Sequence, residues 1–535
     1  MDNKKIKIVS IISIIALALT LVAATYAYFA AQTGEGAQTD IKINANTVDT
    51  FTFEAGSALN LSLNQENFAS GKGNQTGTTF AKAILTANNK TNTATKNYYM
   101  YLNISNNTFT YSIDENTPEI LLTIKDASNN EITTLTGLTY KTVTDGKGAS
   151  IKGFDITTKS GLITILNNRE ITTTSTKTEQ WNVTVTFVNY NANQAGNAGK
   201  RFSAKLMIQQ EKILTVLSDM CTSGNNLASC VTTLLNKSEP SIVNIYHHTS
   251  SLANGAGDNS YRYAGANPNN FVCFGSDASP CPTDNLYRIV GVFGENNHGV
   301  TGKQLVKLIK YDYATSALLG TDGDYQGSET PIAPYYNGSL TSIDRYYWNN
   351  VTKKNTWSES NLNKTNLNTN FINNIGTTWA NKIETTTWKV GGNTYNNILR
   401  SVPATVYQNE IVNPVTTNTT DNKTEYSAKI GLMYASDYGF AAVPEAWTTT
   451  IVNYSESVNG STIRSQNWMY MGDADWTISR DSGYSSGAFR VEYHGELYGY
   501  NAGHNAGAVR PYFNLLSSTT YLSGSGSKSD PLRIN

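Results

Sequence analysis

The sequence has little charge and no bias toward one sign. Charged side chains make up 15% of its 535 residues, and 40 Lys and Arg against 41 Asp and Glu leave a net charge of -1. Nucleic-acid-binding proteins need clustered positive charge to release counterions from phosphates. We therefore expect no nucleic-acid partner. The 12 Pro and 41 Gly also exclude a proline-rich or collagen-like chain.

Several common signatures of enzymes are missing. The zinc-binding helix HExxH, the P-loop and the dinucleotide-binding glycine pattern are absent, and the chain has only five His. These absences favour a non-enzymatic protein without a cofactor. A secreted glycan-active or protein-modifying enzyme is the alternative from another class.

Only one long apolar run occurs, and it lies at the N-terminus. Lys4, Lys5 and Lys7 precede residues 8–31, which carry no charged side chain. Lysines before an apolar run stay on the cytoplasmic side, so we expect export, with the bulk of the chain extracellular at the cell surface or anchored in the membrane. Small residues over 22–27 suit a signal peptidase, but the run also exceeds the roughly 20 residues that span a bilayer. A cleaved signal peptide over 1–31 and a retained anchor that contacts the membrane through 8–31 both stay open.

Cysteine is rare and absent from the first 220 residues. The four cysteines form two close pairs, which we interpret as the disulfides Cys221–Cys230 and Cys273–Cys281 of an exported protein. A zinc site is the weaker alternative because CxxC spacing is missing.

Residues 32–210 alternate between apolar and polar side chains, as half-buried strands do. The apolar positions of the clearest strands are Tyr98, Met100, Leu102, Ile104, Ile120, Leu122, Ile124, Trp181, Val183, Val185 and Phe187. Clusters of Asn, Gly and Asp between the strands are typical of turns. The pattern predicts an all-β antiparallel sandwich.

The pattern then changes twice. Apolar residues over 211–244 recur at helical spacing around Gly224, which predicts a short helical hairpin that links two domains and is clamped by the first disulfide. Residues 245–535 mix strands with an i,i+4 series from Leu367 to Ile383 that predicts one or two helices. We expect a single large α+β domain there. The fold class is therefore multidomain: an N-terminal signal or anchor helix, the sandwich, the linker and the α+β domain.

Aromatic residues gather near the C-terminus beside Asn, Asp and Arg. Such rings stack on sugar faces while polar groups bond the hydroxyls. The candidate ligand-binding residues are Trp468, Trp476, Arg480, Glu492, His494, Tyr498, Tyr500, His504 and Arg510. Arg490, Glu492 and His494 also alternate on one predicted strand over 489–493, where a His between carboxylates transfers protons or holds a metal. The alternative for these three is a solvated face with cross-strand ion pairs.

Two short acidic segments are candidates for calcium. Asp322 and Asp324 place alternating oxygens on a tight turn, although the full EF-hand pattern is missing. The pair Asp473 and Asp475 is a weaker candidate of the same kind.

Two partial resemblances can be named from these residues. The apolar run that ends in Thr25-Tyr26-Ala27-Tyr28-Phe29, followed by the Asn/Thr-rich sandwich, resembles the exported TasA/camelysin group of Gram-positive bacteria over about residues 10–210. The resemblance implies removal of the signal and assembly of surface fibres. The acidic residues usual after the Tyr-Phe pair are replaced here by Ala30-Ala31-Gln32.

The region over 245–535 resembles C-type-lectin-like surface domains of gut Firmicutes, which share their fold with formylglycine-generating enzymes. The motifs that carry this resemblance are Leu286–Val292, Leu367–Ile375, Trp476–Arg480 and Val509–Leu515. No cysteine follows Cys281, so the resemblance implies the fold and surface exposure without the enzymes' cysteine chemistry.

We therefore expect a non-enzymatic bacterial surface protein for adhesion or fibre assembly. Its partner would be a surface glycan, a cell-wall polymer, or a host or neighbouring protein, and the sandwich would self-assemble. A purely structural surface-layer component is a further alternative.

Overall fold

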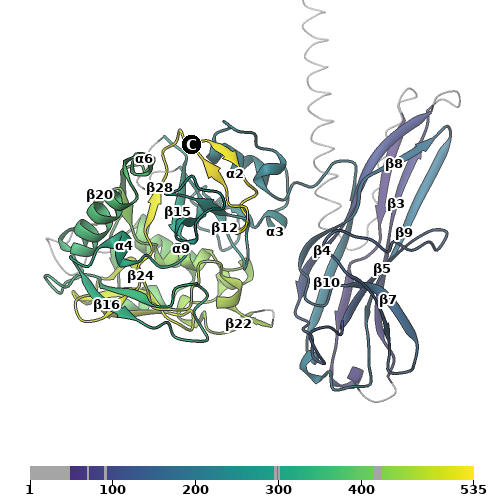
Figure 1. The fold of residues 1–535 in the computed structure, drawn as a ribbon, viewed down its shortest axis with the longest axis horizontal. Helices are drawn as coiled ribbons and strands as arrows, with labels where there is room; N and C mark the ends of the chain where they lie inside the picture. The colour runs from purple at the N-terminus through teal and green to yellow at the C-terminus, as the bar shows by residue number, and fades with distance from the viewer. Residues whose placement is uncertain are drawn as a thin grey trace, which may run out of the picture. The chain divides into compact units, whose positions relative to one another are not determined.

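The computed structural model describes residues 49–68, 72–88, 93–294, 298, 302–414, 424–458 and 460–535 (Figure 1). The chain divides into two compact units, Met1–Lys212 and Ile213–Asn535. The predicted signal peptide or anchor over 1–31 lies outside the described residues. Within the described ranges, no helix is long and apolar enough to cross a membrane. Antiparallel strands dominate both units, so the prediction of a β-rich, multidomain chain is confirmed.

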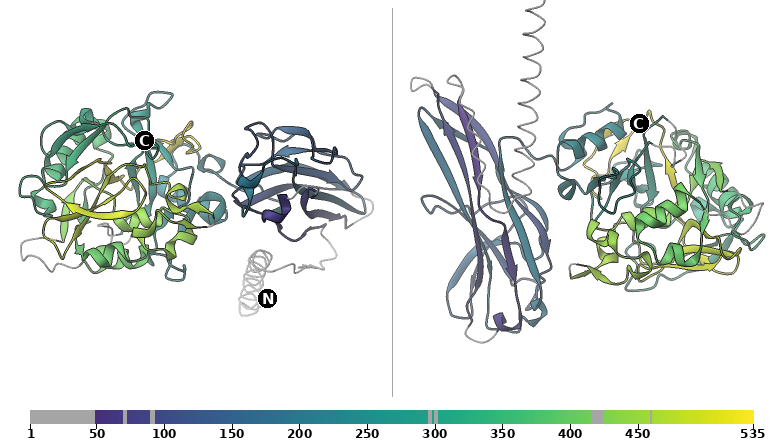
Figure 2. Two further views of the ribbon diagram at one scale, coloured as in Figure 1. Left: turned by 90° about the horizontal axis from the view of Figure 1, so that it is seen from below. Right: turned by 180° about the vertical axis from the view of Figure 1, so that it is seen from behind.

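The first unit consists of two antiparallel sheets, which Figure 2 shows as two layers. One sheet has the strand order β1-β3-β9-β5-β7-β6, and the other has the order β2-β10-β4-β8. The strands are β1 (Thr50–Ala55), β2 (Leu59–Ser62), β3 (Gln75–Thr86), β4 (Ala94–Asn107), β5 (Ile120–Asp126), β6 (Tyr140–Thr144), β7 (Ser150–Asp155), β8 (Gly161–Thr173), β9 (Thr176–Phe187) and β10 (Arg201–Gln209). Two short 3-10 helices, η1 (Gln65–Phe68) and η2 (Ala195–Asn197), interrupt the loops.

The two sheets of the first unit pack against each other through the buried, alternate side chains of their strands. Met100, Leu102 and Ile104 of β4 are at most 2% exposed and share one hydrophobic core with Val183 and Val185 of β9. Burial of one such side chain contributes about 1.5–3 kcal/mol relative to its exposure. The predicted alternation is confirmed in these strands.

The second unit is built around a seven-stranded sheet with the order β11-β12-β14-β15-β28-β21, in which β13 also pairs with β14. Smaller sheets, including β19-β24-β25-β26, surround it. The strands are β11 (Ile245–His247), β12 (Tyr261–Tyr263), β13 (Phe271–Cys273), β14 (Leu286–Phe293), β15 (Leu305–Lys310), β16 (Tyr325–Glu329), β17 (Ile343–Tyr347), β18 (Thr386–Lys389), β19 (Gly392–Asn393), β20 (Glu425–Ala428), β21 (Ile430–Gly431), β22 (Ser457–Val458), β23 (Ser461–Thr462), β24 (Asp475–Asp481), β25 (Gly487–Val491), β26 (Leu497–Asn501), β27 (Ala506–Gly507), β28 (Tyr512–Asn514), β29 (Tyr521–Ser523) and β30 (Arg533–Ile534).

The helices of the second unit are short. The α-helices are α2 (Leu227–Asn236), α3 (Pro240–Val243), α4 (Ser316–Leu319), α5 (Ile372–Asn374), α6 (Thr377–Ala380), α7 (Tyr395–Leu399), α8 (Pro403–Tyr407) and α9 (Ala435–Phe440). The π-helical segments are η7 (Leu362–Phe371) and η8 (Gln408–Val412). The 3-10 helices are η3 (Leu217–Asp219), η4 (Thr283–Asn285), η6 (Trp357–Glu359), η9 (Pro444–Thr448), η10 (Ile451–Asn453) and η11 (Ile463–Gln466).

The i,i+4 series from Leu367 to Ile383 forms helices as predicted, first a π-helical segment and then short α-helices. Leu367 and Phe371 lie on η7, and Trp379 lies on α6; each is buried in the core of the second unit. Asn366, on the same π-helical segment, donates from its side-chain amide to the carbonyls of Leu319 and Asp322 at 2.8 and 3.1 Å.

Of the segment predicted as a linker over 211–244, residues 213–244 belong to the second unit. Leu217 and Leu227 are fully buried in that unit's core, and the amide of Leu227 donates to the carbonyl of Thr519 at 3.0 Å. The first helix of the predicted hairpin is reduced to the single turn η3. Asp219 explains this, because its carboxylate accepts hydrogen bonds from the amides of Thr215 and Val216 and fixes a local turn.

Both predicted disulfides are confirmed. Cys221 and Cys230 have their Cα atoms 6.0 Å apart, and Cys273 and Cys281 have theirs 5.9 Å apart. The first bond joins the turn after η3 to α2, and the second closes the loop between β13 and β14.

Candidate functional site

The hairpin of β25 and β26 brings predicted aromatic residues to the surface. Its register pairs Arg490 with Tyr498 and Ala488 with Tyr500, so these side chains share one face. Phe489 and Val491 on the other face are buried in the core. Ala488, on the same face as Arg490, is buried in the core as well, so this face reaches solvent only in part.

Arg490 and Tyr500 form a stacked pair on this face. The guanidinium carbon of Arg490 lies 3.7 Å from the ring centroid of Tyr500. Arg490 also donates from Nε to Oε1 of Glu492 and from Nη1 to the carbonyl of Ala506, both at 2.6 Å. Burial raises the pKa of the Tyr500 hydroxyl, and the charge of Glu492 adds to this effect. The guanidinium is thus held in place on three sides.

Tyr498 is the exposed ring of the hairpin. It is 44% exposed, and its ring meets the ring of Tyr395 edge to face, with centroids 5.6 Å apart. Tyr484, in the turn before β25, is 61% exposed. We call Tyr395, Arg490, Tyr498 and Tyr500 the hairpin patch.

Glu492 and His494 do not form the predicted acid–base pair. β25 ends at Val491, so the predicted strand over 489–493 is too long, and His494 lies in the following turn. Its Nε2 lies 3.2 Å from the Tyr335 hydroxyl and its Nδ1 lies 3.7 Å from Oε1 of Glu496. Since Glu492 bonds Arg490, the two side chains have different partners.

Five of the predicted ligand-binding residues are buried in the protein: Trp468, Trp476, Arg480, Glu492 and Arg510. Trp476 is 0% exposed, and its indole N–H donates to the carbonyl of Tyr346 at 2.8 Å. Trp468 donates in the same way to the carbonyl of Tyr263 at 2.8 Å. Neither ring has a face to offer to a sugar, so the prediction of stacking at these two residues is corrected to core packing.

The two predicted arginines are buried as well. Arg510 donates from Nε to Asp475 at 2.6 Å and from Nη2 to the carbonyl of Met469 at 2.7 Å. Arg480 is 3% exposed, and burial lowers its pKa to about 10. His504, by contrast, is exposed in the loop after β26.

The acidic candidates for calcium have other partners. Asp324 is 1% exposed, and its carboxylate accepts from the amides of Asn350 at 3.0 Å and Leu362 at 2.7 Å, which places it at the start of η7. The Asp322 carboxylate accepts from the side chain of Asn370 at 2.6 Å. The two carboxylates therefore do not converge on one point. The described part of the chain contains no group of three or more His, Cys, Asp or Glu side chains placed to hold a metal ion.

The weaker acidic pair forms ion pairs with arginines. Asp473 pairs with Arg345 at 2.7 Å, and Asp475 pairs with Arg510 at 2.5 Å. Burial raises the pKa of Asp475 to about 6, although Arg510 opposes this shift. These carboxylates are buried counterions.

Residues 483–487 read Gly-Tyr-Ser-Ser-Gly and match the letters of the GxSxG pattern of hydrolases. That pattern needs a sharp turn from a strand into a helix. Here the segment joins the antiparallel strands β24 and β25, and the carbonyl of Ser485 accepts from the amide of Asn355 at 2.8 Å. It is a hairpin turn and not a nucleophile elbow.

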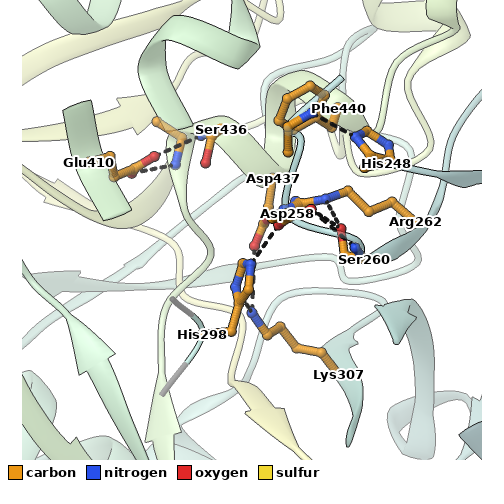
Figure 3. A network of polar contacts seen from close by, with 12 residues as sticks. His248, Asp258, Ser260, Arg262, His298, Lys307, Glu410, Ser436, Asp437 and Phe440 are labelled. Atoms are coloured by element: carbon orange, nitrogen blue, oxygen red, sulfur yellow. Dashed lines mark hydrogen bonds and ion pairs between the residues drawn. The ribbon is translucent and has the colours of Figure 1, made fainter. Parts of the chain in front are cut away.

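The second unit also contains a buried polar network that is not evident from the sequence (Figure 3). Arg262 of β12 is central: Nη2 pairs with Asp258 at 2.7 Å, Nη1 bonds Asp437, and Nε donates to Ser260 at 2.8 Å. His298 Nε2 lies 2.7 Å from Oδ2 of Asp258. Asp258 and Ser260 are close to Arg262 in the sequence, but Asp437 and His298 come from separate parts of the chain, so no local motif signals the network.

The network is balanced in charge. Burial lowers the pKa of His298 to about 4, so its ring is neutral, and burial lowers the pKa of Lys307 to about 8. Burial alone would raise the pKa of Asp437, but the charges of Arg262 and Lys307 outweigh it and hold this pKa below its ordinary value. Two cations thus face the carboxylates of Asp258 and Asp437.

Glu410 of η8 forms a second buried polar site beside this network (Figure 3). Its carboxylate accepts hydrogen bonds from the amides of Ala435 at 3.0 Å and Ser436 at 3.1 Å, at the start of α9, and from the Ser479 hydroxyl. Burial raises the pKa of Glu410 to about 7. Glu410 therefore fixes the first turn of the helix that carries Asp437.

The first unit has a groove of about 380 Å³ where β1 ends. It is lined by residues 56–57, 78–80 and 182–184, which are mostly small or uncharged polar residues. β1 pairs only with Ala81–Thr86 of β3. On the edge of β3 that faces β1, the remaining residues Gln75–Thr79 have no strand partner among the described residues.

No protein-family model, curated protein or solved structure matches the chain. The candidate sites therefore rest on the geometry described above.

Proposed function

We propose that the chain is a non-enzymatic, exported surface protein whose second unit binds a surface glycan or cell-wall polymer at the hairpin patch. The observation that carries this proposal is the ring of Tyr498, which is 44% exposed beside the stacked pair of Arg490 and Tyr500. An exposed aromatic ring on a rigid hairpin gives up little conformational entropy when a sugar stacks on it. The resemblance to C-type-lectin-like surface domains and the predicted export signal support the same proposal.

The charge of the hairpin patch favours a neutral ligand. Glu492 pairs with Arg490, so the guanidinium is not free to attract an anionic polymer. The side chains of Asn501 and Asn505 lie in and after β26 and are partly exposed, although the side-chain oxygens of both already accept from backbone amides of the same segment, those of Gly503 and Asn501.

A glycan array with added cell-wall polymers tests this proposal. The whole exported chain is applied under oxidising conditions, with and without calcium, beside the Tyr498→Ala variant. We expect binding to neutral glycans or polymers, loss of that binding in the variant, and no dependence on calcium. Binding to a protein partner alone, or equal binding by the variant, would refute a glycan site at the hairpin patch.

A second proposed activity is self-assembly through the first unit. The edge of Gln75–Thr79 in β3 has no strand partner on one side among the described residues, and unpaired strand edges pair readily with other chains. The resemblance to the TasA/camelysin group supports assembly into fibres. Sedimentation of the wild-type chain and of a Thr78→Pro variant tests it: we expect oligomers that the proline removes, and a strict monomer at high concentration would count against assembly.

A further inference from the structure

Lys307 is an unusual lysine because it lies entirely inside the second unit. It is 1% exposed on the central strand β15, and its Nζ lies 3.9 Å from the ring centroid of Phe293 and 5.3 Å from that of Tyr512. Its polar neighbours are Nδ1 of His298 at 3.4 Å and Oδ2 of Asp437 at 3.9 Å. An ammonium group has three donors, so these contacts satisfy it poorly and make the loss of its proton easier. Burial accordingly lowers the pKa of Lys307 to about 8.

Asp258, His298 and Lys307 are arranged as an orienting carboxylate, a base and a nucleophile. His298 is neutral, and its Nε2 lies 2.7 Å from Asp258, which as a carboxylate only accepts. We therefore assign the ring proton to Nε2. The lone pair of Nδ1 then faces Nζ of Lys307 (Figure 3). A nucleophile next to a base that a third group orients is the general arrangement for covalent chemistry.

The carboxyl group of Asp437 is the electrophile within reach. Arg262 bonds its Oδ1 and the hydroxyl of Tyr512 donates to its Oδ2. These donors would stabilise negative charge on the oxygens of a tetrahedral intermediate. The side chains of Arg262, Lys307, Asp437 and Tyr512 are at most 2% exposed, so no external substrate is needed or admitted.

We propose that Lys307 and Asp437 form an intramolecular isopeptide bond. Lys307 first passes one proton of its ammonium group to Oδ2 of Asp437, which leaves a neutral amine and a carboxylic acid. Nζ then attacks Cγ of Asp437, and His298 accepts a second proton from the attacking nitrogen. The Cγ–Oδ2 bond breaks, and the departing oxygen, which already carries the first proton, takes the second from His298. The products are one amide and one water molecule, without an oxidant or a second reactant.

The charges of the network allow this reaction. Before it, the two cations Arg262 and Lys307 face the two carboxylates Asp258 and Asp437. The amide removes one charge of each sign, and Arg262 keeps its ion pair with Asp258 at 2.7 Å. No uncompensated charge is left in the interior.

Peptide mass spectrometry of the full-length chain tests the proposal. Trypsin digestion of the denatured, reduced protein should give a branched peptide that joins Gln304–Lys310 to Ile430–Arg464, about 18 Da lighter than the two together because one water is lost. The exposed ion pair of Lys303 and Glu384, at 3.4 Å, is an internal control that should stay unlinked. Full recovery of the separate peptides Gln304–Lys307 and Leu308–Lys310 from the wild-type chain would overturn the proposal.

Two variants locate the bond. Lys307→Arg keeps the positive charge without the reactive amine, so it should lose the branched peptide. Asp437→Asn keeps the shape of the side chain, and attack on its amide would release ammonia and give the same branched peptide. A link that persists in Lys307→Arg, or that joins another pair of residues in the wild-type chain, would refute the assignment.

Discussion

The guanidinium carbon of Arg490 lies 3.7 Å from the centre of the Tyr500 ring, on the face of the hairpin where Tyr498 reaches solvent. A cation stacked on an aromatic ring at an exposed site contributes about 0.5–1 kcal/mol. Glu492 and the carbonyl of Ala506 hold the same guanidinium from other directions. The pair therefore makes a rigid support for the exposed ring next to it.

We predict that Trp476 contributes to the stability of the fold and not to glycan binding. Its ring is fully buried and its N–H bonds the carbonyl of Tyr346, so Trp476→Phe should lower the free energy of unfolding by about 1–3 kcal/mol through lost volume and one lost hydrogen bond. Denaturant unfolding measures this effect. Glycan binding of the folded variant should equal that of the wild type, and a selective loss of binding would contradict the core assignment.

Glu410 is predicted to make stability fall as the pH rises. Its pKa is about 7 in the folded chain and about 4.5 when unfolded, so between these values the folded state keeps a proton that the unfolded state has lost. This contribution falls by up to about 3 kcal/mol as the pH rises from about 4.5 to 7. Glu410→Gln has no such proton. The stability of the variant relative to the wild type should therefore increase from pH 5 to pH 8, as measured by urea unfolding. A difference that does not change with pH would contradict this.

We predict that His298 has the opposite effect, so that its contribution to stability rises with pH. Its pKa falls from 6.5 to about 4 on folding, so the unfolded chain binds a proton that the folded chain rejects. The stability from this group is complete above about pH 6.5 and is lost as the pH falls toward 4, by up to about 3 kcal/mol. His298→Gln should flatten the acid limb of a plot of stability against pH. His504→Gln, at an exposed site, is the matched control and should leave that limb unchanged.

Each disulfide is predicted to stabilise the second unit. Cys221–Cys230 and Cys273–Cys281 close loops with sequence separations of 9 and 8, and loops of this length restrict the unfolded chain by about 2.5 kcal/mol. Replacing either pair by Ala should lower the free energy of unfolding of the second unit by about that amount. Guanidinium unfolding with a probe in each unit measures it. The first unit contains no cysteine and should unfold unchanged.

The strands of the first unit were predictable because one face of each is buried. Met100, Leu102 and Ile104 enter one core, and the period of two that this requires is visible in the sequence. The disulfides were predictable because each pair is close in sequence. The π-helical form of η7 was not, since the spacing of its apolar residues is equally typical of an α-helix.

The candidate site was predictable only in part. Tyr498 is exposed and Tyr500 lies two residues further along the same strand, so both stay candidates. β24 is buried along its whole length, and the sequence alone does not show that Trp476 faces the core. The network around Arg262 had no local signal because Arg262 and Asp437 are 175 residues apart in the chain. Only the folded second unit brings them together.

The most direct test of the proposed glycan site is a calorimetric titration of the whole chain with the polymer selected on the array. Tyr498→Ala should weaken binding at least about tenfold, or about 1.4 kcal/mol, without changing the free energy of unfolding. Leu522→Ala, which alters an apolar residue that is 40% exposed elsewhere in the second unit, should bind as the wild type does. Equal affinity of wild type and Tyr498→Ala would contradict a binding site at the hairpin patch.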